Sequence, residues 1–361
     1  MPTYNFSAGP AMLPRPVLRQ VQDELLDFRG IGASVIELGH RTPTFAAVAD
    51  TATRLFRQIT GLPDHYHVLF VHGGARMQFS ALPLNLLGRS PTRLSAHVET
   101  DYFSVRAREE AQRYGPTEVV ATSEPTGFDR IPDVVPEACP TDAAYLHLTS
   151  NNTVAGTRWT EIPSGLPVPV VVDATSDLMS RRIDLARCGV VYAGFQKNLG
   201  PSSLALVVVR DDLLGLALPE TPHLLNYSVY AETGSMANTP NTFAIYVMSL
   251  MMAWVVEEGG LPAVEVANQA KADLLYAALD RSRLFVPTAH PGHRSHANVT
   301  FRLPGEELTD AFVAQGEARG LLALRGHFSV GGLRASLYNG MPVEGVEALV
   351  DFMEDFERAS G

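Results

Sequence analysis

The stretch VVYAGFQKNLGP, residues 190–201, decides the fold, because an apolar run passes directly into a turn that contains Lys197. The first four residues predict a buried strand, and the glycines and the proline that follow mark a turn. In an open α/β sheet, ligands gather at the carboxyl ends of the strands. A lysine at such an end can form an imine with the aldehyde of a cofactor.

Lysine is rare in this chain. The 28 basic residues include only two lysines, Lys197 and Lys271. Most lysines are solvated surface residues, and this is the alternative for Lys197. Its place in an apolar strand-to-turn segment favours instead a lysine that carries pyridoxal phosphate.

A second apolar run ends on a carboxylate. Residues 170–172 are valines, Asp173 follows them, and one short crossover can make this strand a neighbour of the strand before Lys197. Pyridoxal phosphate acts as an electron sink only while its ring nitrogen stays protonated, and a buried aspartate beside that nitrogen raises its pKa. We therefore predict that Asp173 pairs with the ring nitrogen. A helix N-cap or a turn aspartate is the alternative.

A glycine turn offers a place for the cofactor phosphate. Residues 72–76 read HGGAR between a predicted strand and a predicted helix. Small residues let backbone N–H groups approach an anion at a helix N-terminus, where the helix dipole favours negative charge. Many strand-to-helix turns contain glycine only because the backbone conformation requires it. The motif therefore indicates a phosphate site only in combination with Lys197 and Asp173.

The order of the predicted elements indicates an α/β fold. Strands are predicted at residues 67–71, 144–148, 168–172, 190–193 and 204–209, with helices between them at 77–87 and 105–114. Continuous apolar runs are typical of a buried parallel sheet. We expect a large doubly wound, mostly parallel domain over residues 16–260 and a smaller α+β domain over 261–361. Residues 1–15 are expected to pack with the small domain.

Composition limits the possible partners. The formal net charge of −11 gives no basic stripe for nucleic acid, and the apolar residues 243–256 are too short to span a membrane. Cys139 and Cys188 lie far apart, outside any CxxC pair, which predicts neither a disulfide framework nor a metal site and favours the cytoplasm. Phosphate-loop, dinucleotide, zinc-protease and esterase motifs are also missing from the sequence.

Taken together, the motifs resemble those of the phosphoserine aminotransferases, class V enzymes with pyridoxal-phosphate fold type I. The resemblance runs nearly end to end, through residues 5–14, 39–41, 72–74, 184–201, 238–240 and 330–339. It implies transamination between glutamate and 3-phosphohydroxypyruvate in serine biosynthesis, with small amino acids and 2-oxo acids as partners. A longer phosphorylated substrate of pyridoxine biosynthesis is a second substrate that the resemblance implies.

The resemblance also assigns roles by position, with Lys197 as the imine lysine and Asp173 at the ring nitrogen. Further cofactor contacts would be Ala75, Arg76, Phe103, Thr153 and Gln196, with Asn238 and Thr239 reaching the cofactor of the neighbouring subunit. Substrate contacts would be Arg334 at the α-carboxylate and His40, Arg41 and His327 at the distal acidic group. These roles imply a homodimer with active sites at the subunit interface. A structural salt bridge is the alternative for Arg334.

Four residues depart from the family pattern. Phe103 stands where the family often has tryptophan, Phe195 replaces alanine, and Gly39 replaces serine. Phe328 replaces an arginine that helps hold the substrate phosphate, and such a charge-assisted contact is typically worth about 1.5–3 kcal/mol. The alternative is therefore a paralogous aminotransferase that acts on another 3-substituted, acidic or less charged 2-oxo acid.

Overall fold

The computed structural model describes residues 2–360, and a sheet of seven strands lies at its centre. In spatial order the strands are β2 (Tyr66–His72), β10 (Leu204–Arg210), β9 (Val190–Gly194), β8 (Val170–Asp173), β5 (Leu146–Thr149), β3 (Ser95–Glu99) and β4 (Thr117–Thr122). β10 runs antiparallel to β2 and β9, and the other neighbours are parallel. The predicted mostly parallel sheet is confirmed. The expectation of a parallel strand is wrong for β10, because burial on both faces, and not strand direction, makes its sequence apolar.

Helices cover both faces of the sheet. Successive valines point to opposite faces: Val171 packs with the helices of one layer, and Val172 with those of the other. The first layer holds α3 (Gly74–Leu86), α4 (Tyr102–Ala111) and α5 (Tyr227–Glu232), and the second holds α2 (Pro43–Thr60) and α6 (Thr242–Glu257). This is the expected doubly wound arrangement.

The helix α6 is apolar almost all round because it is buried between α2 and the sheet. Within residues 2–360, no single helix combines the length and hydropathy of a membrane span. α6 and the next helix, α7 (Leu261–Arg281), have the length and hydropathy of a membrane span only when they are taken together, and their axes meet at a bend of 86°.

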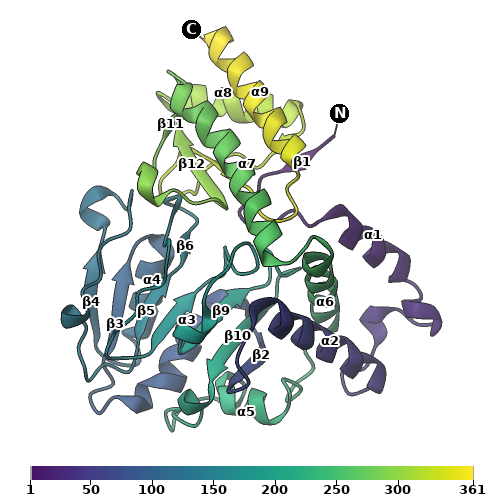
Figure 1. Ribbon diagram of the computed structural model, residues 1–361, viewed down its shortest axis with the longest axis vertical. Coiled ribbons are helices and arrows are strands. Elements are labelled where there is room, and N and C mark those ends of the chain that lie inside the picture. The colour runs from purple at the N-terminus through teal and green to yellow at the C-terminus, as the bar shows by residue number, and fades with distance from the viewer. Residues whose placement is uncertain (1, 361) are drawn as a thin grey trace.

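A smaller domain lies above the sheet in Figure 1, and α7 leads into it. It contains β11 (Val286–Pro287), β12 (Asn298–Arg302), β14 (Leu333–Ser336), α8 (Glu306–Ala318) and α9 (Val343–Ser360). Five phenylalanines give it a separate core: Phe285, Phe301, Phe312, Phe352 and Phe356.

The N-terminal segment joins this smaller domain. β1 (Tyr4–Asn5) pairs in parallel with β13 (Leu321–Leu322), and Phe6 is buried in the same core. The chain then passes through α1 (Arg15–Glu24), which lies against α6. We propose the division expected from the sequence, with residues 1–15 and 261–361 forming one unit and 16–260 the other, since the two core clusters support it.

Some elements were not predicted. β3 was not predicted, because its sequence SAHVE is not an apolar run. Its polar side chains are nevertheless buried and have partners: His97 Nε2 lies 3.0 Å from Ser95 Oγ, and Glu99 forms an ion pair with Arg108. The helix at 77–87 begins instead at Gly74, because Gly73, with φ +91°, ends the turn and α3 takes in the residues that follow.

Candidate functional site

A cavity of about 350 Å³ lies at the carboxyl ends of β8 and β9. It brings together nine of the thirteen predicted site residues: Ala75, Arg76, Phe103, Thr153, Asp173, Gln196, Lys197, His327 and Arg334. Ala8 and Gly9 of the N-terminal segment also line it. The cavity therefore contains residues from both domains.

Lys197 lies in the turn after β9 and is only 9% exposed, so the alternative of a solvated surface lysine is wrong. Its Nζ is 6.0 Å from the centre of the Tyr338 ring. The next residue, Asn198, donates to the carbonyls of Ser176 at 3.5 Å and Leu178 at 3.3 Å. The turn that carries Lys197 is thus tied to the loop that follows Asp173.

Asp173 is the last residue of β8, and β8 and β9 are parallel neighbours, as predicted. Its Oδ1 accepts hydrogen bonds from Thr175 N at 3.0 Å and Thr175 Oγ1 at 2.5 Å. Burial raises the pKa of Asp173, and the Thr175 bonds and the charge of Lys197 oppose that rise. A carboxylate in this position gains from any further positive or hydrogen-bond-donating group in the cavity.

A buried polar pair lies behind Asp173. Tyr192, its register partner on β9, has its hydroxyl 3.0 Å from His147 Nε2. Burial lowers the pKa of His147 to about 3, which keeps the imidazole neutral at physiological pH. Asp173 thus rests against a neutral polar layer, with Lys197 as the nearby positive charge.

The anion end of the cavity is the start of α3. Gly73 and Gly74 have φ values of +91° and +68°, a conformation that favours glycine, and the helix begins with Ala75 and Arg76 facing the cavity. A Cβ at Gly194 would lie 2.5 Å from Gln196 Oε1 and 3.1 Å from the Ala75 Cβ, so a larger residue there would displace the Gln196 side chain. This absence of side chains lets an anion approach the backbone N–H groups of α3.

Aromatic rings surround the mouth of the cavity. The His327 ring centre lies 4.9 Å from that of Tyr102, 6.1 Å from Phe103 and 4.2 Å from Phe328. Phe103 lines the cavity, whereas Phe328 is 83% exposed and does not. The departure at position 328 therefore lies at the rim of the site.

Arg334 projects from β14 into the cavity and is fixed by a hydrogen bond from Nη1 to the Thr153 carbonyl at 3.0 Å. Burial lowers the pKa of its guanidinium group. It forms no ion pair with any other residue of the range 2–360, so the salt-bridge alternative is wrong. A half-buried guanidinium without an ion-pair partner among the described residues is suited to bind a carboxylate.

Four predicted residues do not line the cavity. Arg41, Asn238 and Thr239 are exposed on the surface of this single chain. His40 is half-buried, and its Nε2 has no hydrogen-bond partner within the described part of the chain. Their assignment to a neighbouring subunit stays a prediction.

Several residues that shape the site were not predicted. Thr175 holds Asp173, and Tyr192 lies beside it; a tyrosine within an aliphatic strand was the available signal for the latter. Asp101 is fully buried at the start of α4, where Oδ2 accepts from Val154 N at 2.9 Å and Ala155 N at 3.4 Å. Burial raises the pKa of Asp101 to about 6. It was missed together with the strand β3 that leads to it.

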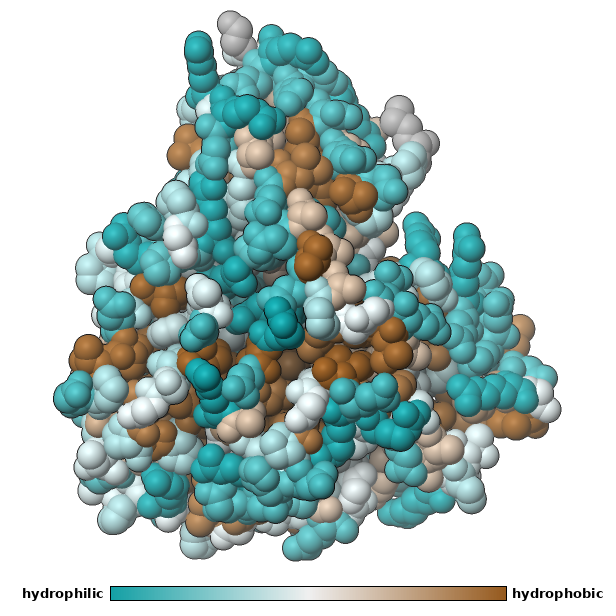
Figure 2. Space-filling model, in the orientation of Figure 1, coloured by the Kyte–Doolittle hydropathy of each residue, from teal (hydrophilic) through white to brown (hydrophobic). Residues whose placement is uncertain are grey.

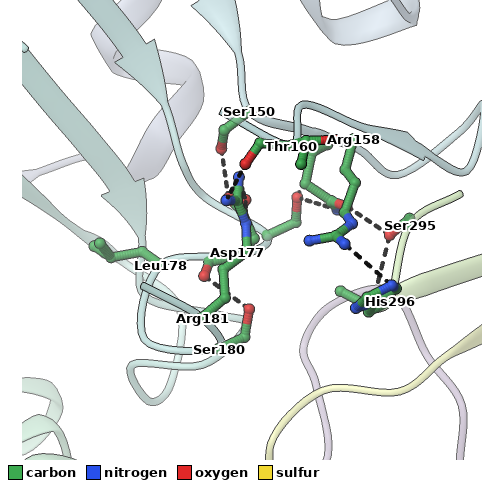
Figure 3. A network of polar contacts seen from close by, with 12 residues as sticks. Ser150, Arg158, Thr160, Asp177, Leu178, Ser180, Arg181, Ser295 and His296 are labelled. Carbon is green, nitrogen blue, oxygen red and sulfur yellow. Dashed lines mark hydrogen bonds and ion pairs between the residues drawn. The ribbon is translucent and has the colours of Figure 1, made fainter. Parts of the chain in front are cut away.

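Polar contacts also join the two domains behind the cavity, as Figure 3 shows. In the large domain, Arg181 Nε donates to Asp177 Oδ2 at 2.9 Å. Across the domain boundary, Arg158 Nη2 lies 3.1 Å from His296 Nε2, and Arg158 Nε donates to the Arg294 carbonyl at 3.2 Å. The Arg158 contacts fix β7 (Thr157–Arg158) relative to the small domain.

Known proteins resemble the chain over its whole length. The Aminotransferase class-V family matches residues 3–349. Phosphoserine aminotransferase from Geobacillus kaustophilus is 47% identical, with 98% of each chain covered, and that from Pseudomonas putida is 46% identical, with 99% of each covered.

Solved structures agree with the sequence relatives. Phosphoserine aminotransferase from Bacillus circulans subsp. alkalophilus has a TM-score of 0.96 and 42% identity, over 100% of this chain and 99% of the other. The PLP-bound phosphoserine aminotransferase from Trichomonas vaginalis has a TM-score of 0.93 and 34% identity, over 98% and 100%. Fold and sequence therefore point to the same group of proteins.

Asp101 should make stability depend on pH. Because its folded pKa is raised from 3.8 to about 6, the folded chain binds more protons than the unfolded chain in that interval, and stability falls as pH rises through it. Asp101→Asn keeps an acceptor for Val154 N–H but does not titrate. Relative to the unsubstituted protein, the variant should gain about 2 kcal/mol of unfolding free energy between pH 4 and pH 7.

The measurement is urea unfolding of the cofactor-free protein at fixed concentration and several pH values. Asp50→Asn, at an exposed position, is the control and should follow the unsubstituted protein. Parallel curves for Asp101→Asn and the unsubstituted protein would contradict the assignment.

Proposed function

The chain belongs to the phosphoserine aminotransferases of the class V family, and from this premise we propose how its residues carry out the reaction. The protein is a pyridoxal-phosphate-dependent transaminase that exchanges an amino group between L-glutamate and 3-phosphohydroxypyruvate in serine biosynthesis. The observation that carries the proposal is the placing of Lys197 and Asp173 at the ends of neighbouring strands in one cavity. The alternative of a paralogue with another substrate is not favoured, since relatives covering 98% of the chain share the same name.

The cavity residues fit pyridoxal phosphate. The buried Asp173 carboxylate suits a protonated ring nitrogen, the start of α3 suits the phosphate, and Phe103 offers a flat face for stacking. Thr153 and Gln196 add polar groups beside them. Bound there, the cofactor supplies an electron sink for the electrons released when the substrate Cα loses its proton.

Lys197 has two roles in this proposal. Its Nζ would hold the cofactor at the aldehyde carbon. With a substrate bound, the free Lys197 amine would remove the proton from the substrate Cα. Burial in the turn after β9, beside Tyr338, keeps the amine directed into the cavity and away from bulk water.

Arg334 and His327 orient the substrate. The guanidinium of Arg334 binds the α-carboxylate, and its bond to the Thr153 carbonyl fixes the direction in which the remaining N–H groups point. His327, at the mouth, is placed to contact the distal phosphate. Glutamate and phosphoserine both carry an α-carboxylate and a distal anion, so one site serves both substrates.

A homodimer completes the site in this proposal. His40 and Arg41 would reach the partner's substrate, and Asn238 and Thr239 the partner's cofactor phosphate. The chain also exposes apolar side chains, among them Leu26 (86% exposed) and Ile36 (59%), which a second copy would cover in this proposal. Figure 2 shows apolar atoms at the outer edge of the lobe that carries α1. We place the enzyme in the cytoplasm, where its buried free thiols Cys139 and Cys188 would stay reduced.

Lys197→Ala should abolish turnover, because the variant has neither the covalent link to the cofactor nor the amine that moves the proton. The measurement is steady-state transamination, together with borohydride reduction of the unsubstituted holoenzyme and mass spectrometry of its peptides. Since the only other lysine is Lys271, the labelled peptide identifies the lysine without ambiguity. Label on Lys271, or turnover in the variant, would refute the assignment.

Phe328→Arg should lower the KM for phosphoserine. The position is 83% exposed, so solvent weakens the new charge, and we expect roughly a two- to fivefold decrease. The KM for glutamate, whose distal group carries less charge, serves as the comparison and should fall less. An unchanged KM for phosphoserine would show that His327 and the residues of the partner subunit hold the phosphate without help from position 328.

Mixing two inactive variants tests the shared site. Lys197→Ala and Arg41→Ala should each be inactive as homodimers, whereas a mixed dimer has one site with Lys197 from one chain and Arg41 from the other. After denaturation and refolding of an equal mixture, activity should return to about a quarter of the unsubstituted value, because half of the dimers are mixed and each has one intact site. No recovery would place Arg41 in the site of its own chain.

A further inference from the structure

The second lysine, Lys271, holds a turn of the small domain. It lies on α7, is 5% exposed, and has no carboxylate partner among the described residues. Its Nζ donates to the carbonyls of Leu337 at 3.4 Å, Tyr338 at 3.1 Å and Met341 at 2.8 Å. An ammonium group has three donors, so all of them are used on one turn, residues 337–341.

This arrangement is costly for a purely structural contact. Burial lowers the pKa of Lys271 to about 7, which shows that the charge is poorly solvated. An apolar side chain would avoid the penalty of burying the ammonium, but it would remove the donor to the Leu337 and Met341 carbonyls, whereas the Tyr338 carbonyl would keep the Met341 N–H at 2.9 Å. The lysine and the turn therefore depend on each other.

The opposite side of the turn faces the catalytic lysine. The Tyr338 hydroxyl donates to the Ala8 carbonyl at 3.0 Å, and its ring centre lies 6.0 Å from Lys197 Nζ. The backbone N–H of Asn339 donates to Asn198 Oδ1 at 3.1 Å. The turn thus contacts both the residue next to Lys197 and the N-terminal wall of the cavity.

A second residue of α7 supports the same turn. Asn268, three positions before Lys271 and on the same face of the helix, donates from Nδ2 to Asn339 Oδ1 at 2.9 Å and to the Ser180 carbonyl at 2.9 Å. Asn339 Nδ2 in turn donates to the Met179 carbonyl at 2.8 Å. α7, the turn and the loop after Asp173 form one hydrogen-bonded unit.

We propose that Lys271 is a positioning residue for Lys197, acting through turn 337–341, Tyr338 and the Asn339–Asn198 contact. The inference rests on the proposed role of Lys197. Without the ammonium, the turn shifts, and the Lys197 amine no longer meets the substrate Cα in the required geometry. The cofactor contact at Ala75 lies on α3, and the Arg334 guanidinium on β14 is held separately by its hydrogen bond to the Thr153 carbonyl.

The test is Lys271→Met, which keeps the chain length and removes the ammonium. We expect a decrease in kcat of about tenfold to hundredfold, because a small misplacement of a reacting group has that effect, with KM within about twofold of the unsubstituted value. The pH midpoint of the visible absorption band of the bound cofactor should also shift, since it reports the surroundings of Lys197.

The control is Leu279→Ala, two turns further along α7, which removes a buried apolar side chain without touching the turn. It should lower the thermal midpoint and leave both kcat and the absorption midpoint unchanged. If Lys271→Met does not fold, Asn268→Ala removes the neighbouring support and should change the same two quantities in the same direction.

The proposal is overturned if the folded Lys271→Met enzyme, or Asn268→Ala in its place, keeps the unsubstituted kcat and absorption midpoint. It is equally overturned if Leu279→Ala changes both as much. Borohydride labelling of the unsubstituted enzyme separates this failure from a wrong function: label on Lys197 upholds the function whatever the variants of α7 show.

Discussion

The parallel pairing of β8 with β9 is the constraint on which the site depends. Because parallel strands end at the same edge of a sheet, Asp173 and Lys197 face one cavity although a crossover separates them in sequence. Burial raises the pKa of Asp173, and the hydrogen bonds from Thr175 and the charge of Lys197 oppose that rise. The sheet supplies the alignment, and these contacts stabilise the buried carboxylate.

Much of this arrangement could be predicted from the sequence, for reasons that individual residues make clear. β8 and β9 are rich in valine because helices cover both faces of the sheet. A charged residue at the end of such an apolar run is easily recognised in the sequence. The glycines of the turn before α3 were conspicuous in the same way. The local sequence pattern was therefore sufficient to predict those site residues that lie directly next to the end of a strand.

Other features could not be predicted, because they depend on contacts between distant segments. β3 has polar side chains although it is buried. The ion pair between Glu99 and Arg108 explains how the Glu99 side chain can be buried, and this pair is not visible in the sequence of the strand. Thr153 and Arg334, far apart in sequence, meet through one hydrogen bond. The direction of β10 is likewise set by its neighbours and not by its composition.

The pairing of β1 with β13 has a consequence for how the chain is made. Phe6 is buried with Leu321 and Val346, so the core of the small domain joins residues that are far apart in the sequence. During synthesis, Phe6 leaves the ribosome long before these partners exist, and this core can close only after Val346 has emerged. Since Ala8 and Gly9 line the cavity, the active site is completed in the same late step.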